Sequence, residues 1–203
     1  MNQYMFLIAL LLTSWELTSG QNLELMPGTR RFFADVQWLK QVEAAPKWSV
    51  FSRTRATVNW DGQTDLFTGA YLNHTTARGW GGSLVGRIGT NGAGADAGVH
   101  FFRANHTWMI FALVSAEIKR ASSVSWFSIL RFTPDLSENW KLYSSLELFS
   151  SFDSEGHRAS VQRLRVGVAR GTFQFGLGFN ASGFGLRYQL RDWNPGVFIR
   201  TNF

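Results

Sequence analysis

Cysteine is absent from this sequence of 203 residues. Its absence excludes disulfide bonds, thiolate zinc sites, cysteine nucleophiles and the lipid-modified cysteine of a lipoprotein. Only four prolines are present, which leaves room for one domain with a continuous sheet. Long apolar runs are also missing. The run at residues 5–12 is about half the length that a membrane-spanning helix needs, and later runs are broken by Arg, Asn, Ser or Gly, which argues against a helical membrane protein.

Acidic residues are fewer than basic ones, 14 against 20, and the formal net charge is +6. A basic protein can bind nucleic acid, but here the basic residues are spread along the chain instead of gathered in a run, and the chain looks exported. We therefore expect no nucleic-acid partner and favour an anionic membrane or anionic solutes. No group of His, Asp and Glu has the spacing of metal ligands, so no metal and no cofactor are expected.

The first 20 residues have the pattern of a cleaved signal peptide. The apolar run at residues 5–12 is followed by polar residues and then by the small side chains of Thr18, Ser19 and Gly20, which suit a signal peptidase. Cleavage is predicted before Gln21, although the start of the chain has no basic residue. Residues 21–29 are interpreted as a short polar lead, and residues 30–203 as the folded domain.

Residues 47–61 show the clearest alternation of apolar and polar side chains. One parity is mainly apolar: Trp48, Val50, Ala56, Val58 and Trp60. The other parity carries charged and amide groups: Arg53, Arg55 and Asn59. Successive side chains of a strand point to opposite faces, so one face is apolar and the other polar. Twelve residues separate the two tryptophans, about 28 Å along the membrane normal in a strand tilted by about 45°. This spacing matches an apolar band with a Trp at each membrane interface.

The same layout recurs along the chain and predicts an all-β fold, a closed antiparallel transmembrane β-barrel of about 12 strands, with 10 to 14 allowed. The expected strands are 30–42, 47–60, 64–75, 79–89, 95–104, 107–119, 122–133, 139–151, 158–169, 172–180, 184–191 and 196–203. Short turns are expected at both ends of the barrel, at residues 61–62, 105–106, 170–171, 180–183 and 194–196.

The last strand carries the most specific motif. Val197, Ile199, Thr201 and Phe203 share one face, and the chain stops on the aromatic Phe203. This segment resembles the closing strand of bacterial outer-membrane β-barrel proteins. The resemblance implies a location in the outer membrane, contact with its lipid and lipopolysaccharide, and delivery by the barrel-assembly machinery; it implies no substrate. Members of this class have long extracellular loops, whereas no loop here exceeds roughly ten residues, which argues against a receptor or adhesin.

If the Trp-bearing parity faces lipid, the opposite parity places charged side chains in the lumen. The lumen-lining candidates are Asp35, Arg53, Arg55, Arg87, Glu117, Lys119, Arg131, Lys141, Glu147, Arg163, Arg165, Arg187 and Arg200. The girdle candidates are Trp38, Trp48, Trp60, Trp80, Trp108, Trp126, Trp140 and Trp193. Basic residues outnumber acidic ones in the lumen set, and such an excess must be hydrated, paired or bound to anions.

Two functions follow from this lumen. The first is a small passive pore that favours anionic solutes, because a basic ring lowers the barrier for anions. The second is a filled barrel with a structural or accessory role in an outer-membrane complex, in which Asp35, Glu117 and Glu147 pair with arginines. A lipid-modifying enzyme is a weaker alternative: His74, His106 and His157 fall at strand ends or turns, His100 lies mid-strand, and no Ser, His and acid are expected at one depth. No catalytic residue is assigned.

Overall fold

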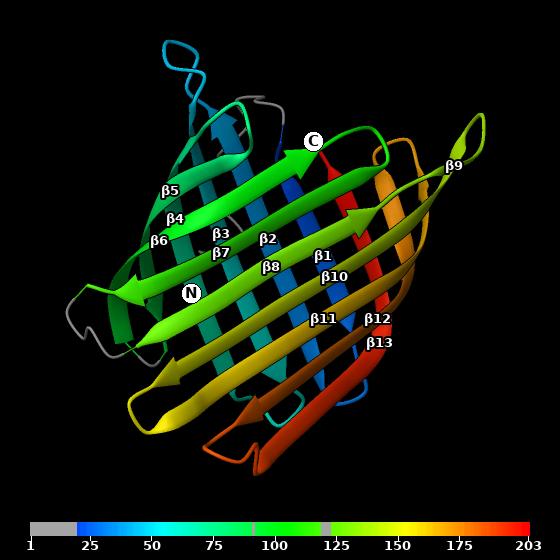
Figure 1. The fold of residues 1–203 in the computed structure, drawn as a ribbon. Coiled ribbons are helices and arrows are strands. Elements are labelled where there is room, and N and C mark those ends of the chain that lie inside the picture. The colour runs from blue at the N-terminus through cyan, green and yellow to red at the C-terminus, as the bar shows by residue number, and fades with distance from the viewer. Residues whose placement is uncertain (1–19, 91, 119–122) are drawn as a thin grey trace, which may run out of the picture.

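The computed structural model describes residues 20–90, 92–118 and 123–203. Within these residues, twelve strands form a closed antiparallel β-barrel, because β13 pairs with β1 and β10 pairs with both β8 and β11 (Figure 1). The strands are β1 (Asn22–Pro27), β2 (Arg31–Gln41), β3 (Trp48–Asn59), β4 (Thr64–Thr75), β5 (Trp80–Gly89), β6 (Gly92–Ala104), β7 (Trp108–Glu117), β8 (Val124–Phe132), β9 (Asp135–Ser137), β10 (Trp140–Asp153), β11 (Gly156–Arg170), β12 (Phe173–Phe184) and β13 (Leu190–Asn202). The short β9 pairs only with β10 and lies outside the ring (Figure 1).

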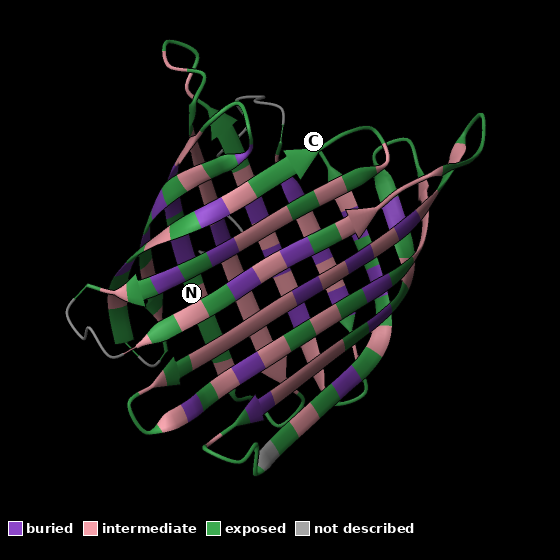
Figure 2. Ribbon diagram, viewed as in Figure 1, coloured by how far each residue is buried: buried purple, intermediate pink, exposed green. Residues whose placement is uncertain are grey.

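The strands alternate as the sequence predicts. Figure 2 shows buried and exposed residues succeeding one another along each strand. The outward parity is apolar and exposed, as in Leu177 at 70% and Ile88 at 66%. Large apolar side chains that water would surround are stable when they face hydrocarbon, so the outer wall fits a lipid bilayer. No helix among the described residues is long and apolar enough to span a membrane.

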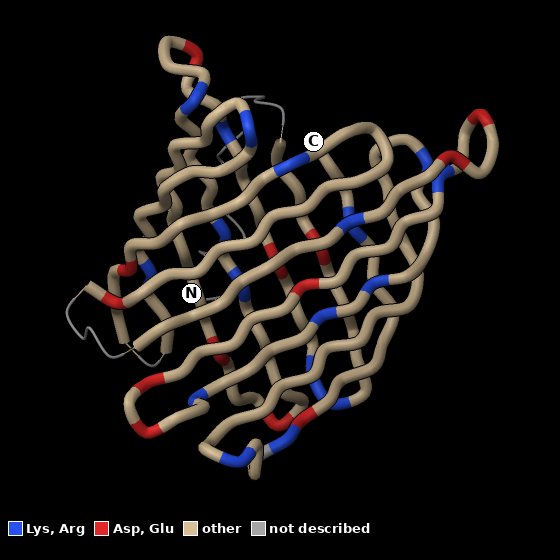
Figure 3. The backbone as a smooth tube through the Cα atoms, in the orientation of Figure 1, with Lys and Arg blue, Asp and Glu red and all other residues tan. Residues whose placement is uncertain are grey.

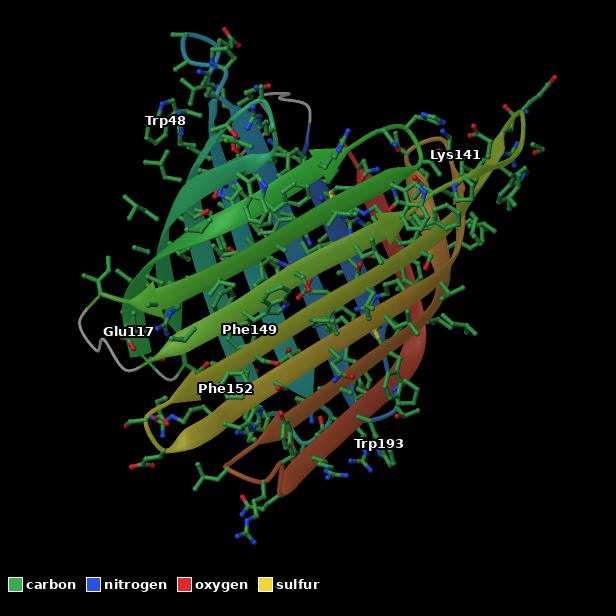
Figure 4. All side chains as sticks on the ribbon, viewed as in Figure 1. Trp48, Glu117, Lys141, Phe149, Phe152 and Trp193 are labelled. Atoms are coloured by element: carbon green, nitrogen blue, oxygen red, sulfur yellow. The ribbon has the colours of Figure 1, made fainter. Side chains whose placement is uncertain are left out.

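The two ends of the barrel are marked by tryptophans. We call the end that carries Asn22 and Asn202 the proximal end; Phe203 N there donates to Gln21 O at 3.0 Å. The opposite end is the distal end. Trp38, Trp48, Trp80, Trp108 and Trp140 lie toward the proximal end, and Trp60, Trp126 and Trp193 toward the distal end. Figure 4 shows Trp48 and Trp193 at opposite ends. The eight girdle candidates therefore form two groups, one at each rim.

The predicted number of strands is confirmed, but two segments differ from the expected boundaries. Asn22–Pro27, expected as a polar lead, is β1 and pairs with both β2 and β13, so the barrel starts before residue 30. Residues 184–191 and 196–203, expected as two strands, are the end of β12, a turn at residues 185–189 and the single strand β13. The turns expected at 180–183 and 194–196 are wrong, because both segments lie inside strands. The signal peptide expected at residues 1–20 lies, apart from Gly20, outside the described residues.

Asn194 explains why a turn-like triplet lies inside a strand. Its buried side chain accepts hydrogen bonds from Arg30 N at 2.9 Å and Arg31 N at 3.2 Å, and it donates to Arg31 O at 3.0 Å. It therefore satisfies the backbone of the turn between β1 and β2. The glycines Gly28 and Gly196 form a close bridge beside it, where a Cβ on either would clash with its neighbours. The triplet Asn194, Pro195 and Gly196 therefore belongs to β13, where it contacts the turn between β1 and β2, and it does not reverse the chain.

Asn194→Ala is expected to lower the free energy of unfolding by about 2 kcal/mol, because two backbone amides and one carbonyl lose their buried partner. The measurement is a urea titration of the refolded protein in detergent micelles. Asn105→Ala is the matched control: Asn105 Oδ1 also accepts from two backbone amides, Thr107 N at 2.9 Å and Trp108 N at 2.7 Å, but in an exposed turn where water replaces it. Equal losses in the two variants would contradict the role assigned to Asn194.

Candidate functional site

Charged residues of strands on opposite walls lie at mid-height of the barrel (Figure 3), and their side chains meet in its interior. We call this set the arginine belt. It comprises Arg53, Arg55, Arg131, Arg163, Arg165 and Arg200 with the carboxylates Glu24, Asp35 and Glu147. All nine belong to the inward parity of their strands. The alternation of the sequence turns these side chains inward, and closure of the barrel brings them together.

One half of the belt is built around Asp35 and Glu147. Arg53 Nε donates to Asp35 Oδ1 at 2.8 Å, and Arg53 Nη1 donates to Glu147 Oε2 at 2.5 Å. Arg55 and Arg163 also donate to Glu147, so three guanidinium groups share two carboxylates. The register of the strands sets these contacts locally, because Asp35 lies opposite Arg55 and Glu147 opposite Arg163. Arg53 then links β2 and β3 to β10 across the lumen.

The other half of the belt is built around Glu24. Arg165 Nε donates to Glu24 Oε1 at 2.8 Å, and Arg200 Nη1 lies 3.7 Å from Glu24 Oε2. Arg200 Nη1 also donates to the hydroxyl of Tyr143 at 3.1 Å. Arg131 approaches the same tyrosine, with its guanidinium carbon 5.9 Å from the ring centroid. One carboxylate therefore accompanies three arginines in this half.

The belt has an excess of positive charge. Its six arginines face three carboxylates, and most of these groups are removed from solvent, with Asp35 only 1% exposed and Arg53 3%. Charges in a low-dielectric interior cost several kcal/mol each unless they are paired. The buried Nε atoms of Arg55, Arg131, Arg163 and Arg200 have no hydrogen-bond partner among the described residues. The belt thus contains buried ion pairs together with guanidinium N–H groups that have no hydrogen-bond acceptor among the described residues.

Two cavities meet at the belt. A large one of about 840 Å³ opens toward the distal end and is lined mostly by residues of the distal halves of the strands, including Arg87, Phe127 and Phe149. We call it the vestibule. A small one of about 20 Å³ lies inside the belt. Arg163 lines both cavities, so its side chain separates the vestibule from the interior of the belt. The lumen is open on the distal side and is blocked at mid-height by the side chains of the belt.

The vestibule has its own ion pairs. Arg87 Nε donates to Asp96 Oδ2 at 2.8 Å, and Arg87 Nη2 lies 3.6 Å from Glu117 Oε2. Register again explains the contact, since Asp96 lies opposite Glu117 on β7 and opposite Val85 on β5, two residues from Arg87 on the same face. Arg87 is partly exposed to the vestibule, so it can meet a solute there.

Eight of the thirteen predicted lumen residues lie together in the belt, and two lie in the vestibule. The belt residues are Asp35, Arg53, Arg55, Arg131, Glu147, Arg163, Arg165 and Arg200; the vestibule residues are Arg87 and Glu117. Two are corrected. Lys141 is 49% exposed at the rim, where it pairs with Asp135 of the β9 extension (Figure 4), and Arg187 lies in the exposed turn after β12 instead of on a strand. Lys119 lies outside the described residues.

Sequence reasoning missed Glu24, Asp96 and Tyr143. Glu24 was placed in the N-terminal lead, yet residues 22–26 already alternate Asn, Leu, Glu, Leu and Met, and this short alternation was the signal for a strand. Asp96 follows a glycine-rich stretch that carries little periodicity. Tyr143 lies on the polar parity of β10, but only the closed barrel brings it between Arg131 and Arg200.

Two Ser–His pairs form that the sequence did not predict. Inside the barrel, Ser83 Oγ and His100 Nδ1 are 2.8 Å apart and Thr75 Oγ1 and His100 Nε2 are 2.9 Å apart. Near the distal rim, His157 Nδ1 donates to Gly185 O at 2.8 Å, and His157 Nε2 accepts from Ser160 Oγ. Both histidines are buried, and neither is hydrogen-bonded to a carboxylate among the described residues. The hydrogen bonds of His100 link β6 to β4 and β5, and those of His157 link β11 to the turn at residues 185–189.

No family model matches the sequence, and no curated protein sequence matches it. Similarity appears at the level of the fold. The NanC porin superposes with a TM-score of 0.59 at 8% sequence identity, covering 91% of this chain and 100% of that one. The KdgM porin in complex with disordered oligogalacturonate superposes with a TM-score of 0.53 at 4% identity, covering 90% and 98%. This chain has the fold of a small porin.

A third neighbour shows that the barrel alone does not define an activity. LpxR from Salmonella typhimurium superposes with a TM-score of 0.52 at 10% identity, covering 90% of this chain and 99% of that one. One barrel architecture supports several functions, so function has to be argued from the residues that line this barrel. In this porin-like barrel, those residues are the arginine belt and the vestibule.

Proposed function

We propose that this protein is an outer-membrane channel for small anionic solutes, exported through its signal peptide and embedded by its apolar outer wall. The observation that carries the proposal is the vestibule of about 840 Å³, which leads from the distal end to Arg55 and Arg163 of the belt. Its volume is in the range of pockets that hold small organic molecules. A structural neighbour is a porin in complex with oligogalacturonate, a polyanion, and this ligand agrees with a preference for anions in the present barrel.

Electrostatics support the preference for anions. The belt carries three more guanidinium groups than carboxylates, and cations that enter the vestibule approach this excess charge in a low-dielectric tube. An anion gains from the same field and can use unpartnered guanidinium N–H groups as hydrogen-bond donors. The belt acts as the selective constriction, and the vestibule collects solutes in front of it.

The test is single-channel recording of the refolded protein in a planar bilayer under a potassium chloride gradient. Discrete steps with a reversal potential near that of chloride are expected. Steps that reverse near the potassium potential would contradict anion selectivity. Extraction with sodium carbonate tests the membrane assignment, because a barrel with a lipid-facing wall stays in the pellet.

A second function is favoured by one specific observation. The cavity inside the belt is only about 20 Å³, so the ion pairs fill the barrel at mid-height. A barrel that is filled in this way can serve as a structural subunit of an outer-membrane complex. A folded, heat-modifiable protein that stays electrically silent would favour this function, and affinity purification from cross-linked outer membranes would then identify the partner.

A further inference from the structure

The Glu24 half of the belt carries more uncompensated charge than the Asp35 half. Arg165 and Arg200 share the single carboxylate of Glu24, and Arg131 has no ion pair among the described residues. In the other half, two carboxylates serve Arg53, Arg55 and Arg163. The Glu24 half therefore has an excess of two positive charges, compared with one in the Asp35 half.

These charges converge on one small space. Arg131, Arg165 and Arg200 all line the cavity of about 20 Å³, together with the hydroxyl-bearing Ser145. Arg131 and Arg165 lie on either side of Ser145 in one row across β8, β10 and β11. Arg200 comes from β13, is 4% exposed, and has a buried Nε without a partner. The three guanidinium groups thus reach the same cavity from different strands.

Gly178 of the neighbouring strand leaves room for the side chains of Met26 and Arg165. Gly178 lies opposite Arg165 on β12, and a Cβ at Gly178 would come within 2.8 Å of Met26 Sδ and 3.4 Å of Arg165 Cδ. Asn180 of the same strand accepts a hydrogen bond from Arg165 Nη1 at 2.9 Å, so Arg165 is held between Asn180 and Glu24. The lining of the cavity contains five arginines and two carboxylates, Glu24 and Glu147, so positive charge is in excess around it.

Size restricts what can neutralise this charge. A cavity of this volume holds about one water molecule. A carboxylate or sugar does not fit, whereas a monoatomic halide is only slightly larger than water and accepts hydrogen bonds from several N–H donors at once. A neutral water leaves the like charges of Arg131 and Arg200 unscreened in a low-dielectric interior, which is costly.

We infer that the cavity between Arg131, Arg165 and Arg200 is a binding site for one chloride ion, which completes the charge balance of the belt. This inference deepens the proposed anion channel and names a resident ion at its constriction. It does not require that current flows, since a filled barrel needs the same counter-charge.

The experiment compares thermal unfolding of the native protein in chloride and in gluconate at equal ionic strength. Gluconate is too large for the cavity, so the midpoint temperature is expected to rise with chloride concentration in a saturable way, as binding to the folded state requires. Arg131→Met removes one donor and one charge at similar length. Its midpoint is expected to be independent of chloride, and in gluconate it is expected to exceed that of the native protein.

Arg103→Met is the matched control, because Arg103 is an exposed arginine of β6 away from the belt. It is expected to keep the full chloride response. A native midpoint that does not respond to chloride, or an Arg131→Met variant that responds like the native protein, would overturn the site. Crystals grown in bromide give a second measurement that needs no variant: an anomalous peak is expected within hydrogen-bond distance of Arg131 and Arg200, and a peak elsewhere or none would overturn it.

The outcome of the chloride experiment can be distinguished from the outcome of the bilayer recording that tests the channel. A silent barrel in the bilayer with a saturable chloride response would contradict the proposed transport and leave the ion site standing. A conducting, anion-selective barrel without the chloride response would leave the channel standing and remove the resident ion.

Discussion

Glu147→Gln is expected to be the most damaging single substitution in the belt, lowering the free energy of unfolding by about 3–5 kcal/mol. Glu147 is buried and bonded to Arg53, Arg55 and Arg163, so its loss leaves three guanidinium groups with Asp35 alone. Removing one partner of a buried ion pair costs more than the pair contributes, because the remaining charge stays buried. Urea titration in micelles, followed by heat modifiability on gels, measures the effect.

Glu138→Gln is the control for this prediction, since Glu138 is exposed beside β9 and is expected to tolerate the change. The double variant Glu147→Gln with Arg163→Ala tests the mechanism. It removes one carboxylate and one guanidinium group together, and it is expected to recover part of the lost stability as a coupling between contacting residues. Losses that simply add, or a Glu147→Gln protein as stable as the control, would show that charge balance does not hold the belt together.

Arg163→Ala is expected to increase single-channel conductance severalfold and to weaken the preference for anions. Arg163 lines both cavities, so truncating it joins the vestibule to the interior of the belt. The substitution also removes the one excess charge of the Asp35 half, leaving Asp35 and Glu147 with Arg53 and Arg55. The fold is expected to survive for that reason. Conductance and reversal potential in the same bilayer give both readouts.

Arg158→Ala serves as the comparison for the conductance experiment. Arg158 also lines the vestibule, but it is 56% exposed at the distal rim and pairs with Asp153 at 2.9 Å. Its loss is expected to leave conductance near the native value. An increase in both variants would assign the effect to the vestibule as a whole, and no increase in Arg163→Ala would contradict the view that this side chain closes the lumen.

The sequence by itself determined the class of fold and the direction of each side chain. Alternation in segments such as Trp48–Asn59 has a period of two, and a strand must then present an apolar face and a polar face. The tryptophans at the ends of those segments marked the two rims for the same local reason. Thirteen charged residues could therefore be predicted for the lumen, and ten of them lie in the belt or the vestibule.

Only the tertiary structure decided where the chain enters and leaves the ring and which charges meet. Asn22–Pro27 is too short for its alternation to stand out, and it is a strand because β2 and β13 both pair with it. Asn194, Pro195 and Gly196 have the composition of a turn, but hydrogen bonds to the β1–β2 turn hold them extended. The arginine belt joins residues more than 90 positions apart, such as Arg53 and Glu147. Periodicity fixes the face of a residue, whereas its height and its partners across the lumen depend on the stagger of the closed barrel, which no local pattern encodes.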